Sequence, residues 1–306
     1  MSNGLALYGM GLFGEPIEPP KRGKIADEFV TPPFTVLNAR EGFWQERKAA
    51  WVGMGIDGEI GRGANLINHS KTTTLGEKDT SIFDPVLTEL CYRWFCPPAG
   101  LIIDPFAGGS VRGIVASCLG RRYCGIELRA EQIASNREQA TEICDSGPMP
   151  EWIEGDSRNA AVLCGGLQAD FIFSCPPYGN LEVYSDDPRD LSTLEYPAFA
   201  GSLAEIIKAS CDLLLPDRFA CFVVGNFRDK HGNYHDFAGD TIRAFSAAGL
   251  HYYNEAILVT AVGSLPIRIT KQFKSGRKLG KTHQNVLVFL KGNAKRASDL
   301  CDQGSF

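Results

Sequence analysis

Phe171-Ile-Phe-Ser-Cys-Pro-Pro-Tyr-Gly-Asn180 is an apolar run of the strand type that ends in two prolines and an aromatic ring. Proline cannot donate to a strand ladder and fixes φ at about −65°, so the chain is expected to leave the sheet abruptly here. Tyr178 then lies at the carboxyl end of a strand, which is where open α/β sheets bind ligands. An aromatic face on a stiff turn suits a flat heterocycle, because stacking on a nucleobase contributes about 1–3 kcal/mol.

Seventy residues earlier, the stretch Leu101-Ile-Ile-Asp-Pro-Phe-Ala-Gly-Gly-Ser110 is likewise an apolar run of the strand type that ends in a turn, here with glycines. A glycine loop between a first strand and a helix lets a ligand approach the backbone closely. Glu127 follows Gly109 by eighteen residues and ends the next predicted strand, where an acidic side chain can accept both hydroxyls of a ribose. Asp156 lies in the turn that follows the third predicted strand, where it either accepts from an adenine amine or only caps that turn.

From Leu101 onward, strand patterns alternate with helix patterns, which indicates an α/β fold with a mostly parallel sheet and helices on both faces. The predicted helices are 113–118, 130–144, 196–215 and 240–248. The predicted strands are 101–103, 123–128, 152–153, 169–173, 219–224, 252–259 and 285–290.

The segment before the glycine loop has a different character. Residues 1–79 are predicted to form an arm and covering segment, with a short strand at 34–37, an amphipathic helix at 42–52 and a glycine-rich loop at 53–68. Asp84 is expected to cap a helix that has Pro85 at its first position. Residues 80–298 are predicted to be the main domain and 299–306 a tail.

Composition is that of a globular protein, with 306 residues, 44% of them hydrophobic and 22% charged. No apolar run approaches the ~20 residues of a membrane span, and the first residues lack the charged segment followed by an apolar segment that is typical of a signal peptide. The ten cysteines form no CxxC pair, so neither a zinc site nor a disulfide framework is indicated. We therefore expect a cytoplasmic protein without metal or membrane association.

Charge is distributed unevenly, although the net charge is only −5. No acidic residue lies between Glu255 and Asp299, and this block is basic. A segment whose charges are all positive forms either a solvated face or a phosphate-binding surface. We expect a basic loop at 264–283 that binds nucleic acid through Arg268, Lys271, Lys274, Arg277, Lys278 and Lys281.

Taken together, Asp104-Pro-Phe-Ala-Gly-Gly109, Glu127 and Cys175-Pro-Pro-Tyr178 resemble the motifs of S-adenosylmethionine-dependent DNA amino-methyltransferases, in that order along the chain. Those enzymes methylate the exocyclic nitrogen of adenine or cytosine. The resemblance covers roughly 81–292, and the leading segment around Arg40-Glu-Gly-Phe-Trp-Gln45 is similar to methylases of phage and prophage type. It implies a seven-stranded Rossmann-like sheet whose last strand is antiparallel and pairs with the sixth.

The resemblance also implies roles for individual residues. The segment 81–89 is similar to the family segment that contacts the methionine part of the cofactor. The implied catalytic residues are Cys175, Pro176, Pro177 and Tyr178. The implied S-adenosylmethionine-binding residues are Phe83, Asp84, Asp104, Pro105, Phe106, Gly108, Gly109, Glu127 and Asp156.

Cys175 departs from the family pattern. The family has Asp, Asn or Ser there, whose oxygen accepts hydrogens from the target amine, and a thiol is a poor acceptor. Three alternatives follow: amino methylation with the Pro176 carbonyl sharing the amine, attack of Cys175 on cytosine carbon 6 for carbon-5 methylation, or a non-catalytic binding protein. Ser174 is expected to point away, because side chains alternate along a strand.

The expected substrate is double-stranded DNA, in which the target base must be flipped out to stack on Tyr178. The acidic loop 182–190 would repel phosphates and is expected to face the base or a partner. An RNA base is the alternative substrate, and the residues do not distinguish adenine from cytosine.

Overall fold

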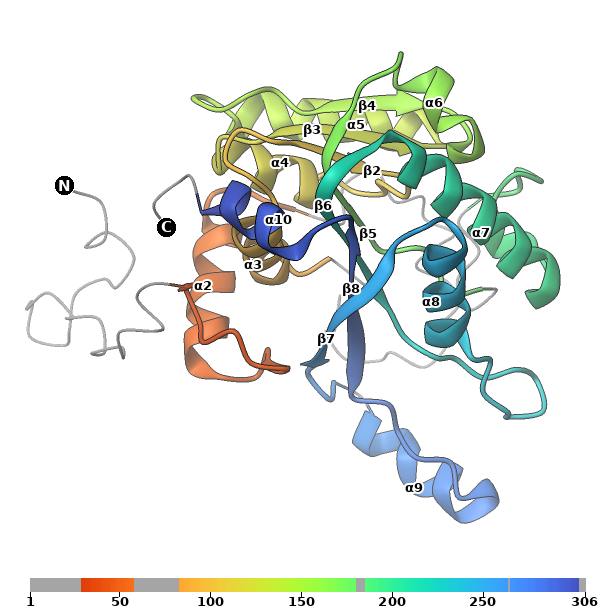
Figure 1. Cartoon of the computed structure of the whole chain (residues 1–306). Helices are drawn as coiled ribbons and strands as arrows, with labels where there is room; N and C mark the ends of the chain where they lie inside the picture. The colour runs from red at the N-terminus through yellow and green to blue at the C-terminus, as the bar shows by residue number, and fades with distance from the viewer. Residues whose placement is uncertain (1–28, 58–82, 180–184, 264, 303–306) are drawn as a thin grey trace, which may run out of the picture.

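The computed structural model describes residues 29–57, 83–179, 185–263 and 265–302 (Figure 1). Its centre is one eight-stranded sheet with the order β1-β7-β8-β6-β5-β2-β3-β4. The strands are β1 (Val36–Asn38), β2 (Leu101–Asp104), β3 (Arg122–Glu127), β4 (Glu151–Glu154), β5 (Ala169–Ser174), β6 (Leu214–Val224), β7 (His251–Val259) and β8 (His283–Lys291).

The strand order confirms the predicted Rossmann-like methyltransferase fold. All neighbouring strands pair in parallel except β8, which is antiparallel to both β6 and β7. The chain runs from β2 outward through β3 to β4 and then returns to β5 on the other side of β2. This reversal leaves a crevice at the carboxyl ends of β2 and β5, the usual ligand position in such sheets.

Helices cover both faces of this sheet, as predicted (Figure 1). Residues of α2, α3, α4, α5 and α10 pack in one hydrophobic core, and residues of α6, α7 and α8 in the other. The helices are α2 (Gly42–Gly53), α3 (Pro85–Phe95), α4 (Val111–Cys118), α5 (Ala130–Ile143), α6 (Ala160–Leu163), α7 (Tyr196–Leu213), α8 (Phe237–Ala247), α9 (Leu265–Gly276) and α10 (Ala294–Cys301).

The apolar run of β5 is continuous because both of its faces are buried. Phe171 and Phe173 point into the core beneath α3, whereas Ile172 points into the core beneath α7. Each of these side chains is fully buried, which contributes roughly 1.5–3 kcal/mol apiece. The strand that ends in the Pro-Pro turn is therefore anchored from both sides.

The predicted cap of α3 is confirmed. Asp84 accepts hydrogen bonds from the backbone N–H groups of Val86 and Leu87 at 2.9 and 3.2 Å, and Pro85 occupies the first helical position. Trp44 of α2 donates to the same carboxylate at 3.1 Å. Asp84 thus joins two helices in addition to starting one.

Three features differ from the sequence expectation. The sheet has eight strands rather than seven, because β1 from the N-terminal segment adds a parallel strand beside β7. The basic segment expected as a loop contains the helix α9, since Pro266 near its start can begin a helix and no breaker follows before Gly276. The predicted boundary at residue 298 lies inside α10. Most of the glycine-rich loop at 53–68 lies outside the described residues.

Candidate functional site

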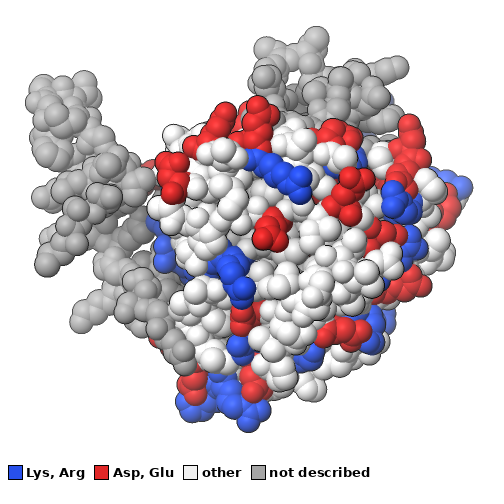
Figure 2. Space-filling model, turned by 90° about the horizontal axis from the view of Figure 1, so that it is seen from above, with Lys and Arg blue, Asp and Glu red and all other residues white. Residues whose placement is uncertain are grey.

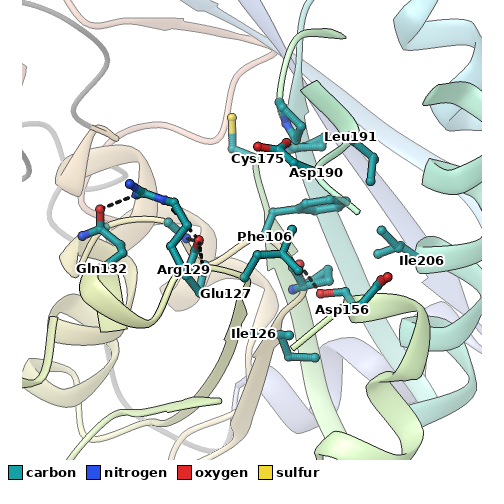
Figure 3. A pocket seen from close by; sticks show the side chains of 18 of the residues that line it. Phe106, Ile126, Glu127, Arg129, Gln132, Asp156, Cys175, Asp190, Leu191 and Ile206 are labelled. Carbon is teal, nitrogen blue, oxygen red and sulfur yellow. Dashed lines mark hydrogen bonds and ion pairs between the residues drawn. The ribbon is translucent and has the colours of Figure 1, made fainter. Parts of the chain in front are cut away.

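A pocket lies in the crevice at the carboxyl ends of β2, β3, β4 and β5 (Figure 3). It brings together the glycine loop, the ends of the next two strands and the Pro-Pro turn, which are distant in sequence. The predicted residues that line it are Phe83, Pro105, Phe106, Gly108, Gly109, Glu127, Asp156, Cys175, Pro176, Pro177 and Tyr178.

Asp104 does not line the pocket, contrary to its expected role in contacting the cofactor. It is fully buried and accepts hydrogen bonds from the Arg112 guanidinium, the Tyr123 hydroxyl, the Ser174 hydroxyl and the Phe106 N–H group. Arg112 also donates to the carbonyls of the glycine loop at Phe106 and at residue 107. Asp104 therefore holds the loop in shape from behind.

Glu127 reaches the pocket from the end of β3 and is held by the backbone. The Gly108 N–H donates to Oε2 at 3.0 Å and the Arg129 N–H to Oε1 at 3.1 Å. Burial raises the pKa of Glu127, although the Arg129 charge and these two hydrogen bonds act against that rise. Each oxygen keeps acceptor capacity for a ligand hydroxyl. Gly108, at φ 51°, has the backbone conformation that favours glycine.

Asp156 was expected either to accept from an adenine amine or only to cap a turn. It lines the pocket, and its side chain also accepts from the Arg158 N–H at 2.9 Å to cap the short turn after β4. Burial acts to raise its pKa, but the hydrogen bonds from Arg158 outweigh burial and the pKa is lowered. Asp156 is thus an ionised acceptor at the β4 edge of the pocket.

The Pro-Pro turn presents Cys175 and Tyr178 to the pocket. The Cys175 sulfur lies 4.0 Å from the Tyr178 hydroxyl, which accepts a hydrogen bond from the Gln284 amide nitrogen at 2.6 Å. The Tyr178 ring packs edge-on against Phe237 of α8. Ser174 points away from the pocket, as alternation predicts, and bonds to Asp104.

Phe83 and Asp84, the two residues before α3, face different surroundings. Phe83 lines the pocket, where its ring packs on Phe173 and lies 4.6 Å beneath the Arg112 guanidinium. Asp84 does not line the pocket, because its carboxylate faces α2 and is occupied as described above. Its expected role in cofactor binding is replaced by a structural one.

Several lining residues were not predicted. Their shared feature is that they follow the strand ends or lie on α5 and α7, and no residue type at those positions marks a ligand site in advance. They include Arg129, Gln132, Ser157, Leu191 and Ile206. Ser185, Arg189 and Asp190 also line the pocket, but they belong to the loop 182–190 that was expected to face the base or a partner.

The basic segment divides into an exposed part and an inner part. α9 projects from the body at the foot of Figure 1 and has no buried residue, and Arg268, Lys271 and Lys274 are exposed along it. Lys281 differs, because its ammonium donates to the Asn226 carbonyl at 3.1 Å and burial lowers its pKa. A Cβ added to Gly225 would meet Lys281 Nζ at 2.9 Å and Tyr178 Cε1 at 3.5 Å, so Lys281 lies beside the Pro-Pro turn.

The described part of the chain holds no group of three or more His, Cys, Asp or Glu side chains able to ligate a metal. No helix within it is long and apolar enough to span a membrane.

No protein-family model matches the sequence, and no curated protein matches it. Among solved structures, the chain is similar to TrmN from Thermus thermophilus at 16% identity and a TM-score of 0.47, covering 68% of this chain and 49% of that chain. The chain therefore spans about half the length of TrmN.

Two further likenesses are to methyltransferases. The CcbJ methyltransferase from Streptomyces caelestis has 10% identity and a TM-score of 0.47, covering 72% of this chain and 100% of that chain. The magnesium protoporphyrin IX methyltransferase of Synechocystis, with bound SAM, has 12% identity and a TM-score of 0.45, covering 78% and 98%. Likenesses this distant assign neither substrate nor partner to the chain.

Proposed function

We propose that the chain is an S-adenosylmethionine-dependent methyltransferase that acts in the cytoplasm on the exocyclic amine of adenine or cytosine in DNA. The observation that carries the proposal is the pocket that joins the glycine loop and Glu127 to the Cys175-Pro-Pro-Tyr178 turn. The sequence resemblance to the amino-methyltransferases rests on these same motifs.

The residues of the pocket fit the proposed cofactor. Glu127 offers acceptor oxygens to ribose hydroxyls, and Asp156 offers them to an adenine amine. Phe106, Leu191 and Ile206 line the pocket as apolar walls for a heterocycle. When bound, S-adenosylmethionine supplies a methyl group activated on a positively charged sulfur.

The Cys175-Pro-Pro-Tyr178 turn, which we call the catalytic turn, suits an amine nucleophile that must be held in position. Tyr178, fixed by Gln284 and Phe237, offers a ring on which a flipped base can stack. Methyl transfer to an amine depends mainly on holding the reacting atoms in line, so a stiff turn is well matched to it. The alternative is carbon-5 methylation of cytosine, because the Cys175 thiol also lines the pocket.

We expect the Cys175→Ser enzyme to retain or exceed wild-type activity, because a hydroxyl accepts a hydrogen bond better than a thiol. The measurement incubates DNA with labelled cofactor and the wild-type or variant enzyme, digests the product and identifies the methylated nucleoside. The expected product is an N-methylated adenine or cytosine nucleoside.

Substrate containing 5-fluorocytosine provides the matched control. If Cys175 were a nucleophile, serine could not replace it and the wild-type enzyme would form a trapped covalent adduct. An inactive but folded Cys175→Ser variant together with this adduct would replace amino methylation by carbon-5 chemistry. In a parallel incubation with RNA, methylation of the RNA but not of the DNA would exclude DNA as the substrate.

DNA binding is supported by the exposed cations of α9. Arg268, Lys271 and Lys274 are spaced at three-residue intervals and share one side of the helix. By contrast, Figure 2 shows Lys and Arg mixed with Asp and Glu on the face seen from above, which is turned away from α9. A surface that carries only positive charges binds DNA phosphates, and these contacts give affinity without sequence selectivity.

Replacing Arg268, Lys271 and Lys274 with Gln should weaken binding to all DNA sequences alike. The slope of log affinity against log salt should become shallower by about 0.9 for each phosphate that the variant no longer neutralises. Fluorescence anisotropy over a salt series measures this slope. The matched control replaces Lys208, Arg243 and Lys295, which are exposed but paired with aspartates. Equal slopes for the two triple variants would remove α9 from the DNA-binding surface.

A further inference from the structure

The catalytic turn, Cys175-Pro-Pro-Tyr178, lacks the side-chain oxygen acceptor that the family has at its first position. Cys175 offers only a thiol, and a thiol accepts hydrogen bonds weakly. Its neighbour Ser174 has an oxygen, but this side chain is fully buried and bonded to Asp104. A side-chain acceptor for the target amine, in addition to the Pro176 carbonyl, would therefore come from another part of the pocket.

Asp190 places a carboxylate in the same pocket as Cys175 and Tyr178. It follows the Pro-Pro turn in the chain and is 6% exposed, so its charge is held largely away from bulk water. In Figure 3, Asp190 and Cys175 lie on the same side of the Phe106 ring, with the carboxylate directed toward Cys175 in this view, whereas Asp156 lies on the other side. The charge of Asp190 also contributes to raising the pKa of Glu127.

Neutral groups hold this carboxylate. Oδ1 accepts from the Ser192 N–H at 2.8 Å and from the Ser192 hydroxyl at 2.7 Å, and Oδ2 accepts from the Ser185 hydroxyl at 3.0 Å. Within the described ranges, no Lys or Arg nitrogen lies within 4.0 Å of Asp190, whereas Asp156 and Asp187 each have an arginine partner. A buried carboxylate is costly without a charged partner or donors, and Oδ2 has capacity for another donor.

We propose that Asp190 is the catalytic residue that accepts a hydrogen bond from the target amine, in place of the side-chain oxygen that is missing at position 175. The inference rests on the proposed amino-methyltransferase function and names a residue of the same site. The carboxylate accepts an N–H hydrogen from the amine, which localises the nitrogen lone pair toward the methyl group. Its negative charge also offsets the positive charge that the nitrogen gains.

The step balances without any further reactant. The amine nitrogen forms a bond to the methyl carbon, and the bond from that carbon to sulfur breaks with its electron pair on sulfur. The nitrogen then carries one proton in excess, which passes to the Asp190 carboxylate and from there to water. Positioned proton acceptors of this kind contribute about 10²–10⁴-fold to a rate.

Asp190→Asn tests the proposal, because asparagine caps a helical turn as well as aspartate does but carries no charge. We expect the single-turnover rate of methyl transfer to fall about 100-fold or more, while binding of S-adenosylhomocysteine and of DNA, measured by calorimetry and anisotropy, stays at the wild-type level. The matched control is Asp186→Asn, an exposed position of the same loop, which should leave the rate unchanged. Asp190→Ser, which also retains a capping side chain, serves as a second variant for the same measurements.

Rescue separates a catalytic Asp190 from a purely structural one. In the Asp190→Asn background, Cys175→Asp restores a carboxylate at the family position and should raise the rate by at least about tenfold, a part of the loss expected for a proton acceptor. A wild-type rate in Asp190→Asn, or a loss that Cys175→Asp does not recover, would overturn the proposal. Failure of the proposed function would be recognised separately, since the wild-type enzyme would then yield no N-methylated nucleoside.

Discussion

Replacing Arg112 with Met should lower the free energy of unfolding by about 3–5 kcal/mol, the usual cost of removing one partner from a buried ion pair. Arg112 is 5% exposed and pairs with Asp104, which is fully buried. The variant leaves that carboxylate with only neutral donors, and it removes the guanidinium that binds the carbonyls of the glycine loop. Urea denaturation followed by fluorescence measures the change.

An exposed ion pair provides the comparison for Arg112. Arg296 pairs with Asp217, but its side chain is 68% exposed, so Arg296→Met should cost no more than about 1 kcal/mol. Arg112→Met should therefore lose more stability than Arg296→Met. Equal losses of stability would mean that water reaches Asp104 in the folded protein and that the pair does not organise the glycine loop.

Replacing Tyr178 with Ala should reduce methyl transfer by about 5- to 150-fold, which corresponds to the 1–3 kcal/mol of one stacked base. The ring is the part of the Pro-Pro turn best placed to stack on a flipped base, because Gln284 and Phe237 fix its position. Steady-state kinetics on an oligonucleotide substrate, with kcat and KM determined separately, measure the loss.

Tyr178→Phe is the matched control, because it keeps the ring and removes only the hydroxyl that accepts from Gln284. We expect it to retain most of the activity, with a loss of about 0.5–1.5 kcal/mol for one hydrogen bond. If the alanine and phenylalanine variants lost activity equally, the hydroxyl rather than the ring face would be the functional group. Stacking would then be excluded as the role of Tyr178.

Local sequence was sufficient to predict the order of the strands, most of the helices, the Pro-Pro turn and the cap at Asp84. Each depends on neighbours in the chain: the continuous apolar run of β5 indicates burial on both faces, and Pro85 after Asp84 indicates a helix start. The positions of Glu127 and Tyr178 in one pocket also followed from the sequence. The carboxyl ends of parallel strands meet at one edge of a sheet, so residues at those ends come together.

The direction and partner of each side chain were decided only by tertiary structure. Asp104 looked like a ligand residue but turns inward to Arg112, and Lys281 looked like a surface cation but lies beside Tyr178. The local sequence did not distinguish Asp190 from the other acidic residues of its loop, yet Asp190 is buried in the pocket. A charged side chain has the same sequence signal whether it faces solvent, a ligand or an opposite charge, because only the packing of distant elements sets its surroundings.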